Sequence, residues 1–226
     1  MSLISKKDEQ RNEWDIIWAN KKNISKIITS GRTIYNYFFM LYLKKYITKR
    51  ISFCEVGCGT SSFLLGLSKE VKKATGIDYS DEALKESKKQ RKLKNIKNVF
   101  FVKEDIQDLK LKQGLFDIVW SQGLIEHFSN PLQVIANHLK ICKKDGLIFI
   151  LVPFKYSYLW FWYHFTRNHL FRWAWPWTDQ FFFSKWNLIS YMEKLKKDYP
   201  LLKFNNYEVS NIKPAILGIL SLKIKK

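Results

Sequence analysis

Residues 51–78 read ISFCEVGCGTSSFLLGLSKEVKKATGID, and this stretch decides the fold. A short apolar run, ISFCEV (51–56), ends in a glycine-rich turn. Helical spacing follows in FLLGLSKEVKK (63–73), and ATGID (74–78) reads as a second short strand. A strand, a tight turn, a helix and a second strand in this order predict a right-handed βαβ unit.

The same alternation continues along the chain. Ser80 is suited to cap a helix over 80–94, and Pro131 fits the first turn of a helix over 130–142. Three further strands are predicted, namely VFFVKED (99–105), FDIVWSQG (116–123) and GLIFILVPF (146–154). The last is apolar throughout, as a strand buried on both faces should be. Strands that alternate with helices in this way predict a parallel sheet covered on both sides.

The ends of the chain add helices and two more strands. Apolar residues at helical spacing predict helices over 10–22 and about 33–48, and a later helix over about 184–197. The last two strands are LKFNNYEVS (202–210) and AILGILSLKIK (215–225). We therefore predict one α/β domain with a Rossmann-like, seven-stranded, mostly parallel sheet and helices on both faces.

Composition excludes several classes of protein. With 226 residues, 46% of them hydrophobic, the chain can bury a core, which excludes global disorder. The cysteines, Cys54, Cys58 and Cys142, form an odd, unpatterned set, so neither a disulfide scaffold nor a metal site follows. The N-terminal MSLISKKDEQRNEW has no apolar signal-peptide core, which predicts a cytoplasmic protein.

The net charge of +19 comes mainly from lysine, because 33 of the 39 basic residues are Lys and 6 are Arg. Nucleic-acid recognition favours the planar Arg fork, and these lysines are spread along the whole chain. A nucleic-acid partner is therefore not expected. A solvated basic surface and attraction to an anionic membrane or polymer both remain open.

Carboxylates follow the first three predicted strands. Ligands of an open parallel sheet bind beyond the carboxyl ends of its strands, so residues at these positions are candidates for a site. They are Glu55 with Gly57, Cys58 and Gly59 after the first strand, Asp78 with Tyr79 after the second, Glu104, Asp105 and Ile106 after the third, and Gln122 after the fourth.

The glycine turn has a physical task. Gly57 and Gly59 remove side chains where a ligand approaches the backbone, and they permit positive φ. Asp78 follows Gly59 by 19 residues, a spacing suited to a carboxylate that accepts ribose hydroxyls. The dinucleotide fingerprint also requires glycine where this chain has Ser62, which argues against NAD and FAD.

These motifs, together with FDIVWSQGLIEHF (116–128), resemble those of class I S-adenosylmethionine-dependent methyltransferases. Within that fold the chain is most similar to the group that includes ubiquinone and menaquinone methyltransferases. The resemblance implies a domain made of an N-terminal helical cap, a cofactor-binding core, an aromatic lid insertion after strand five, and a C-terminal helix with strands. Their ranges are 1–49, 50–155, 156–186 and 187–226. One departure is Ser61, where the family commonly has a third glycine.

The resemblance also implies roles at the methionine end of S-adenosylmethionine. The backbone of Gly57 and Gly59, with Cys58 between them, passes beside the amino-acid portion of the cofactor. Glu55 is oriented towards the cofactor's ammonium group, directly or through water. Gln122 lies near the methionine end and the transferred methyl group.

At the adenosine end, the resemblance assigns the ribose hydroxyls to Asp78 and places Tyr79 beside the adenine. Asp105 accepts from the exocyclic amine, and Ile106 holds the edge and face of the ring. For each of these residues a role as a helix cap or turn residue stays open.

Methyl transfer needs a general base only where the acceptor arrives protonated. His127, just past the fourth strand with Glu126 beside it, is the candidate base, and a structural role in packing the loop is the alternative. His138 lies among Lys and Leu in the helix over 130–142 and is expected at the surface.

Residues 158–186 contain 14 aromatic residues in 29 positions. Arg167, Arg172 and Pro176 lie within the stretch and argue against a membrane span. The remaining alternatives are a lid that lines an apolar acceptor pocket, peripheral docking at the inner face of a membrane, and an oligomer interface or plain core.

Together these features predict a methyltransferase that uses S-adenosylmethionine and acts on a small, apolar or lipid-linked acceptor. Two alternatives stay open. One is a nucleic-acid or protein methyltransferase, although SQGL stands where such enzymes carry an N/D-P-P-Y/F tetrapeptide. The other is a non-catalytic scaffold that keeps the fold and binds a partner or a membrane. The methylated atom and the oligomeric state are left open.

Overall fold

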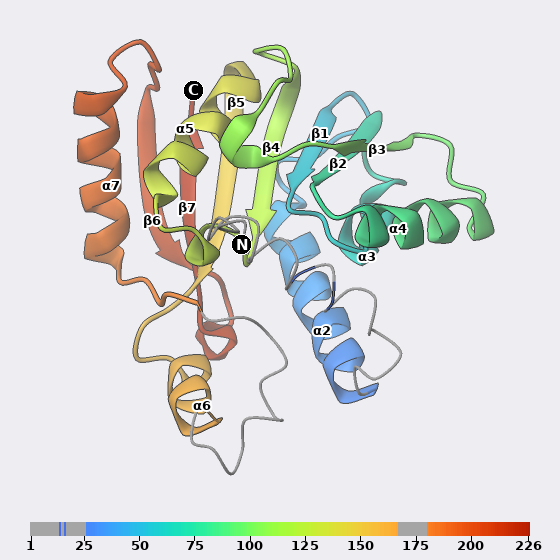
Figure 1. Ribbon diagram of the computed structural model, residues 1–226, viewed down its shortest axis with the longest axis horizontal. Coiled ribbons are helices and arrows are strands. Elements are labelled where there is room, and N and C mark those ends of the chain that lie inside the picture. The colour runs from blue at the N-terminus through green and yellow to red at the C-terminus, as the bar shows by residue number, and fades with distance from the viewer. Residues whose placement is uncertain (1–13, 15, 17–25, 167–179) are drawn as a thin grey trace, which may run out of the picture.

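The computed structural model describes residues 14, 16, 26–166 and 180–226, and a seven-stranded sheet runs through them in the order β3-β2-β1-β4-β5-β7-β6 (Figure 1). The strands are β1 (Ser52–Val56), β2 (Lys73–Asp78), β3 (Val99–Lys103), β4 (Phe116–Gln122), β5 (Cys142–Pro153), β6 (Asn206–Asn211) and β7 (Ile219–Lys225). β1 to β5 pair in parallel, and β7 is antiparallel to both β5 and β6. The predicted Rossmann-like, mostly parallel α/β sheet is confirmed.

Helices connect the strands, and hydrophobic spacing predicts each of them except the one over 158–166. The helix predicted over about 33–48 spans residues 26–43. The helices are α2 (Lys26–Leu43), α3 (Ser62–Leu67), α4 (Asp81–Leu93), α5 (Pro131–Ile141), α6 (Tyr158–Thr166) and α7 (Lys185–Asp198). Local chemistry sets their starts, since Ser80 Oγ accepts the Ala83 N–H at 3.2 Å and Pro131 opens α5, as expected. Ser184 caps α7 through a reciprocal bond with Asn187.

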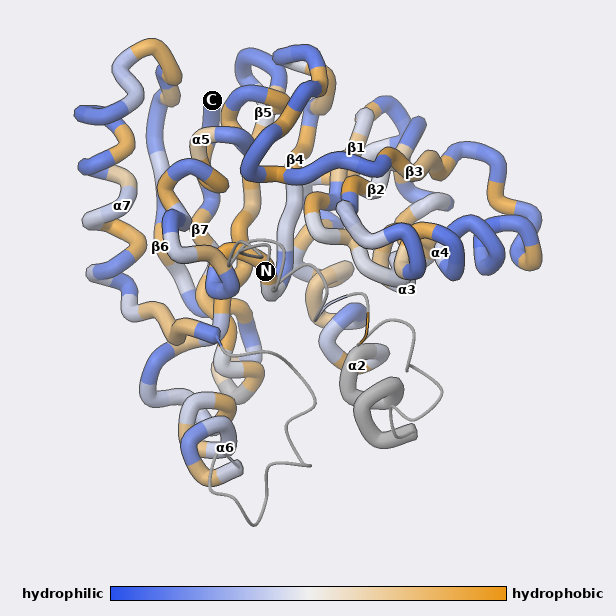
Figure 2. Tube along the Cα trace, in the orientation of Figure 1, coloured by the Kyte–Doolittle hydropathy of each residue, from blue (hydrophilic) through white to orange (hydrophobic). Residues whose placement is uncertain are grey.

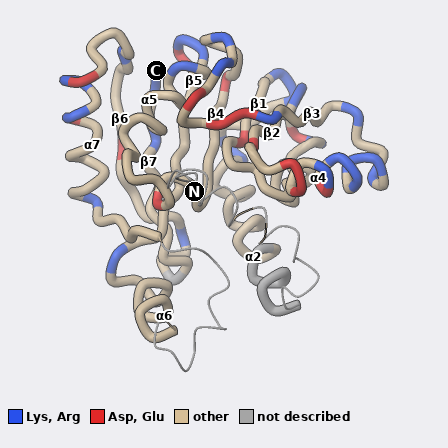
Figure 3. Tube along the Cα trace, viewed as in Figure 1, with Lys and Arg blue, Asp and Glu red and all other residues tan. Residues whose placement is uncertain are grey.

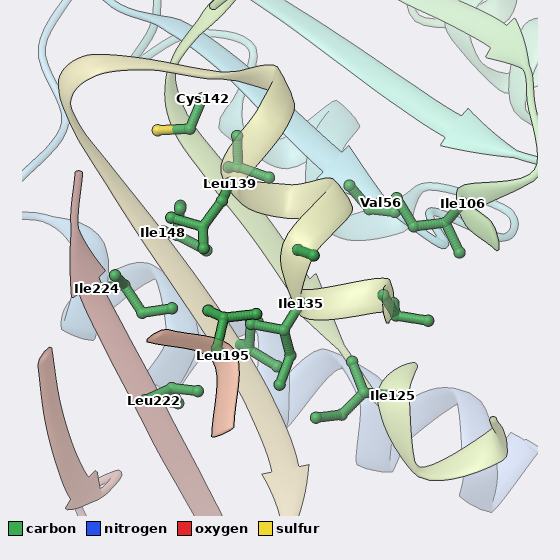
Figure 4. Close-up of a cluster of buried hydrophobic side chains, with 14 of the residues drawn as sticks. Val56, Ile106, Ile125, Ile135, Leu139, Cys142, Ile148, Leu195, Leu222 and Ile224 are labelled. Atoms are coloured by element: carbon green, nitrogen blue, oxygen red, sulfur yellow. The ribbon is translucent and has the colours of Figure 1, made fainter. Parts of the chain in front are cut away.

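Each face of the sheet is covered by its own set of helices. On one face, Ile135 and Leu139 of α5 and Leu195 of α7 pack on Ile148 and Ile224 (Figure 4). Figure 2 shows the hydrophobic residues that line the central strands. Because neighbouring residues of a strand point to opposite faces, Phe149 belongs to the other layer. There it packs with residues of α2 and α3, among them Phe39 and Leu64.

Some boundaries differ from the predicted ones. β5 begins at Cys142, four residues before the predicted 146, because Cys142 already pairs with Phe116 ahead of a register shift in β4. α3 ends at Leu67 rather than at residue 73, because Asn98 Nδ2 donates to the Ser68 and Val71 carbonyls outside the helix. Of the helix predicted over 10–22, only Trp14 and Ile16 lie within the described residues.

The prediction that His138 lies at the surface is wrong. The ring is fully buried. Its Nδ1 lies 2.7 Å from the Val134 carbonyl, and its Nε2 lies 3.0 Å from Ser121 Oγ on β4. Burial lowers the pKa of His138 to about 4, because the charged ring would lose its hydration. The folded protein therefore keeps this histidine neutral.

This burial predicts a loss of stability in mild acid. Between about pH 6.5 and pH 4 the unfolded chain protonates His138 and the folded chain does not, so the free energy of unfolding falls as the pH falls. From pH 7 to pH 5 the loss is about 2 kcal/mol. His138→Gln removes it, whereas His164→Gln, at an exposed residue of α6, does not. Urea unfolding at both pH values measures the difference, and an unchanged pH dependence in His138→Gln contradicts the assignment.

Candidate active site

A cavity of about 350 Å³ lies at the carboxyl ends of the strands, where the strand order reverses between β1 and β4. Chain connections leave such a point towards opposite faces, which opens a crevice between them. Nine of the ten residues predicted for the site line this cavity: Gly57, Cys58, Gly59, Asp78, Tyr79, Asp105, Ile106, Gln122 and His127. The tenth, Glu55, is buried beside it and accepts a hydrogen bond from Gln122 Nε2 at 3.2 Å.

The glycine turn carries backbone along the cavity. The N–H groups of Gly57 and Cys58 donate to the Ile77 carbonyl at 2.8 and 3.1 Å, which ties the turn to β2. Gly57 has φ +69°, and a Cβ there would lie 2.7 Å from Leu124 Cδ1. Ser61 has φ +55°, a left-handed conformation that favours glycine, which explains why a third glycine suits this position.

Asp78 connects the turns that follow β1 and β2. Its Oδ2 accepts the Gly59 N–H at 2.7 Å, and its Oδ1 accepts the Ser80 N–H at 3.0 Å. The side chain is buried at the cavity wall. An ionised carboxylate has about four acceptor positions, so these two bonds leave capacity for further donors. Asp78 can thus shape the turn and bind a ligand hydroxyl.

A second wall is formed after β3. Asp105 Oδ1 accepts the Gln107 N–H at 2.9 Å and so begins the short 3-10 helix Ile106–Asp108. Asn137 of α5 donates its amide N–H to the Ile106 carbonyl, and the Ile106 side chain is buried at the cavity. Both residues are therefore held by the fold rather than by a ligand.

Gln122 has one unsatisfied atom at the base of the cavity. Its Nε2 donates to Glu55, but its buried Oε1 has no hydrogen-bond partner in the part of the chain that the structure describes. Buried acceptors are nearly always paired, so this oxygen marks a position for a ligand donor such as an ammonium group.

Glu126 is a site residue that sequence reasoning named only as a neighbour of His127. It lies in the 3-10 helix Ile125–His127 after β4, is 2% exposed and lines the cavity. Burial raises its pKa to about 8, and its Oε2 has no partner among the described residues. The position after a strand at the ligand edge was a usable signal, but burial could not be read from the sequence. His127 also lines the cavity, with its ring 5.0 Å from that of Trp14.

The cavity is acidic in a strongly basic chain. Its wall contains four carboxyl groups, those of Asp78, Glu104, Asp105 and Glu126. No Lys or Arg of the described residues lines it, although the net charge is +19. Figure 3 shows Lys and Arg gathered elsewhere, along α4 and at the opposite edge of the sheet. This distribution suits a cationic ligand and disfavours a phosphate group.

The segment after β5 covers one side of the cavity. Leu159 of α6 and Gln180 line it, and Phe181 donates its N–H to the Glu126 carbonyl at 3.0 Å. From the other side, the Tyr35 hydroxyl of α2 is hydrogen-bonded to that of Tyr158. A lid role for this segment stays a prediction. Residues 167–179, with three of its tryptophans, lie outside the described residues.

Within the described residues, no group of His, Cys, Asp and Glu side chains could hold a metal ion. The cavity therefore offers backbone, carboxylates and apolar walls. Its acidic lining can bind a cationic ligand, and its apolar residues can contact an apolar group.

Comparisons with known proteins agree with this geometry. A family model described as a methyltransferase domain matches residues 47–170, more than half of the chain. The ubiquinone biosynthesis O-methyltransferase of Haemophilus ducreyi is 30% identical over 101 residues, which are 42% of each chain. A malonyl-acyl-carrier-protein O-methyltransferase of Bacillus cereus is 30% identical over 45% of this chain and 37% of its own. The chain thus spans about two fifths of these curated relatives.

Solved structures share the fold over nearly the whole chain. One is the magnesium protoporphyrin IX methyltransferase of Synechocystis, solved with bound S-adenosylhomocysteine. It superposes with a TM-score of 0.63 and 14% sequence identity over 95% of this chain and 93% of its own. At this identity the likeness concerns the fold alone.

The glycine turn yields a test of the cavity geometry. Gly57→Ala places a Cβ at positive φ and against Leu124, so it should lower the free energy of unfolding by about 1–3 kcal/mol. Gly66→Ala is the matched control, because no atom lies within 4 Å of its added Cβ. As a helical position it should gain about 0.5–1 kcal/mol. Urea unfolding measures both, and equal effects contradict the predicted close approach.

Proposed function

The chain belongs to the methyltransferase domain family, and on that premise we propose that it transfers a methyl group from S-adenosylmethionine to a small, apolar or lipid-linked acceptor. The acidic cavity at the glycine turn is the observation that carries the proposal. S-adenosylmethionine has a cationic sulfonium and no phosphate. A wall with four carboxyl groups and no Lys or Arg among the described residues suits that charge.

The residues present fit the methionine end of this cofactor. A side chain at position 57 would collide with Leu124, so the backbone of Gly57 itself lines the cavity. The amino-acid group of the cofactor can therefore approach that backbone. Among the described residues, the buried Oε1 of Gln122 has no donor, and the Gln122 amide donates to Glu55. Both acceptors suit an ammonium group.

They also fit the adenosine end. Asp78 retains acceptor capacity for ribose hydroxyls, and Tyr79 lies next to it at the cavity wall. Asp105 and Ile106 form the wall after β3, where we place the adenine. Because backbone N–H groups already hold Asp78 and Asp105, little side-chain freedom is lost on binding.

The bound cofactor supplies an electrophilic methyl group. The chain must hold the acceptor atom in line with the carbon–sulfur bond, and positioning of this kind can supply about 7–11 kcal/mol. In the transfer, a bond forms from the acceptor atom to the methyl carbon and the carbon–sulfur bond breaks with its electrons on sulfur. An acceptor that carries a proton passes it to a base, for which Glu126 and His127 at the cavity wall are the candidates.

The acceptor class follows from the rest of the wall. Apolar side chains also line the cavity, namely Phe39, Leu124, Phe128, Leu159 and Ile219, so the acceptor should present apolar surface to them. One curated relative is named for ubiquinone biosynthesis, which supports an apolar acceptor for this chain too. A nucleic-acid acceptor would instead bring phosphates to a wall of carboxyl groups.

The cofactor assignment predicts a loss of affinity in Asp78→Ala. The change removes the acceptor for the ribose hydroxyls, and we expect at least tenfold weaker binding of S-adenosylhomocysteine by calorimetric titration. Asp81→Ala is the matched control, since Asp81 is an exposed residue of α4 paired with Lys103. Thermal unfolding checks that both variants fold. An unchanged dissociation constant in folded Asp78→Ala removes the cofactor assignment.

The raised pKa of Glu126 predicts that a proton is released when a ligand with a positively charged sulfonium binds. With a pKa of about 8, Glu126 is mostly neutral at pH 7, and a nearby cation lowers the pKa of a carboxyl group. Binding of S-adenosylmethionine should therefore release more protons than binding of S-adenosylhomocysteine, which shares every group except the charged sulfur. The excess should approach one proton.

Calorimetric titrations at pH 7 in two buffers of different ionisation enthalpy count these protons. The excess should vanish in Glu126→Gln and persist in His127→Gln, which tests the other titratable group of the same 3-10 helix. His138 does not contribute to the excess, since it stays neutral at this pH. Equal proton counts for the two ligands in the wild type contradict a role for Glu126.

A further inference from the structure

Several long stretches of the chain contain no Asp or Glu: residues 16–54, 146–178, 180–192 and 209–226. They supply α2, α6, the carboxyl end of β5, the start of α7 and the connection from β6 to β7. Figure 1 shows α2 and α6 extending beyond the carboxyl edge of the sheet, and the sequence of neither helix contains Asp or Glu. Among the described residues, α2, α6 and the β6–β7 connection therefore carry no negative charge, whereas Asp81 and Glu82 lie at the start of α4.

α6 presents an exposed apolar stripe at this end. Its members are spaced at i, i+3, i+4 and i+7 and are 47–61% exposed, namely Tyr158, Phe161, Trp162 and Phe165. Leu159, on another side of the helix, lines the cavity. A helix that is apolar on more than one side is normally covered on each.

α2 has a similar second stripe. Phe39 and Leu43 pack on the sheet, while Ile34, Tyr37 and Leu41 are 49–60% exposed at helical spacing. The Tyr35 hydroxyl bonds both to Tyr158 and, at 2.9 Å, to the Leu217 carbonyl, so α2, α6 and the β6–β7 connection are joined. We call the exposed stripes of these two helices, with exposed Phe181 and Trp186, the aromatic face.

Lysines flank the aromatic face. Lys155 follows β5, Lys185 begins α7, and Lys213 lies in the β6–β7 connection. Among the described residues, none of the three has a carboxylate partner within salt-bridge distance. Exposed aromatic rings with unpaired lysines around them match the chemistry of an anionic lipid interface.

We propose that the aromatic face docks the protein on an anionic membrane surface, with the cavity opening towards the lipid. The reason for docking rests on the proposed function, since a lipid-linked acceptor would be dissolved in that membrane. Docking itself requires neither cofactor nor acceptor. Among the described residues, no helix is long and apolar enough to span a bilayer.

Charge favours a membrane over a second copy of the chain. In a two-fold symmetric dimer each face meets itself, so Lys155, Lys185 and Lys213 would approach their own copies. No acidic residue of α2, α6 or the β6–β7 connection is available to pair with them. An anionic lipid surface supplies the missing negative charge.

Vesicle flotation with the full chain tests the proposal. The wild type should float with phosphatidylcholine vesicles that contain phosphatidylglycerol, less with phosphatidylcholine alone, and less at high salt. The triple variant Phe161→Ser, Trp162→Ser, Phe165→Ser should bind at least tenfold more weakly. The matched control, Leu93→Ser with Leu201→Ser, removes apolar residues that are 70% and 93% exposed elsewhere and should float like the wild type.

A second pair of variants tests the lysines. Each basic residue near an anionic surface strengthens binding by roughly fivefold, so Lys155→Gln, Lys185→Gln, Lys213→Gln should lose at least tenfold. Lys112→Gln with Lys144→Gln, at exposed positions near the opposite edge of the sheet, should lose far less. Light scattering in solution reports the oligomeric state of each variant.

Three outcomes overturn the proposal: no flotation of the wild type, equal losses in the matched controls, or a stable dimer that the face variants convert to monomer. Titration with S-adenosylhomocysteine separates this failure from failure of the proposed function. Face variants that keep the wild-type affinity for that ligand but no longer float support docking. Wild-type protein that floats but does not bind the ligand retains the docking surface and loses the methyltransferase assignment.

Discussion

The reversal of strand order between β1 and β4 is the constraint on which the site depends. Parallel strands on either side of this point send their connections to opposite faces, so α3 covers one layer and α5 the other. The gap between the two connections cannot be filled by either helix. Asp78 then fixes its shape, because one carboxylate binds the N–H groups of both Gly59 and Ser80. The cavity is thus a consequence of topology, and Asp78 holds together the turns that follow β1 and β2.

The charge of the cavity wall is opposite in sign to the net charge of the chain. A chain with a net charge of +19 repels cations over most of its surface, yet four carboxyl groups meet at the cavity wall. The sheet makes this concentration possible because each of the first three strands ends next to a carboxylate residue. Burial then adds a second effect, since it holds Glu126 neutral at pH 7 and so reduces repulsion among the acids while the cavity contains no cation.

Sequence patterns predicted the sheet because short-range rules govern it. Strand ends, the Ser80 cap and the glycine turn depend on neighbours a few residues away. His138 shows where the reasoning failed. Its polarity suggested the surface, although Val134, His138 and Ile141 follow the i, i+4, i+7 spacing of a buried stripe. Its partner Ser121 is 17 residues away on another element, and contacts of that kind cannot be read from local spacing.

The aromatic residues after β5 give α6 two apolar sides, one towards the cavity and one towards the outside. α6 must turn Leu159 towards the cavity, which requires an apolar inner side. Its outer side is also apolar, because it carries Phe161 and Phe165. A surface helix that faces water normally has a polar outer side. Phe161 and Phe165 are 61% and 53% exposed, so burying the exposed part of each ring in an apolar medium would stabilise the contact by about 2 kcal/mol. A lid between an apolar acceptor and its lipid solvent accounts for both apolar sides, because each side of the helix then faces hydrocarbon.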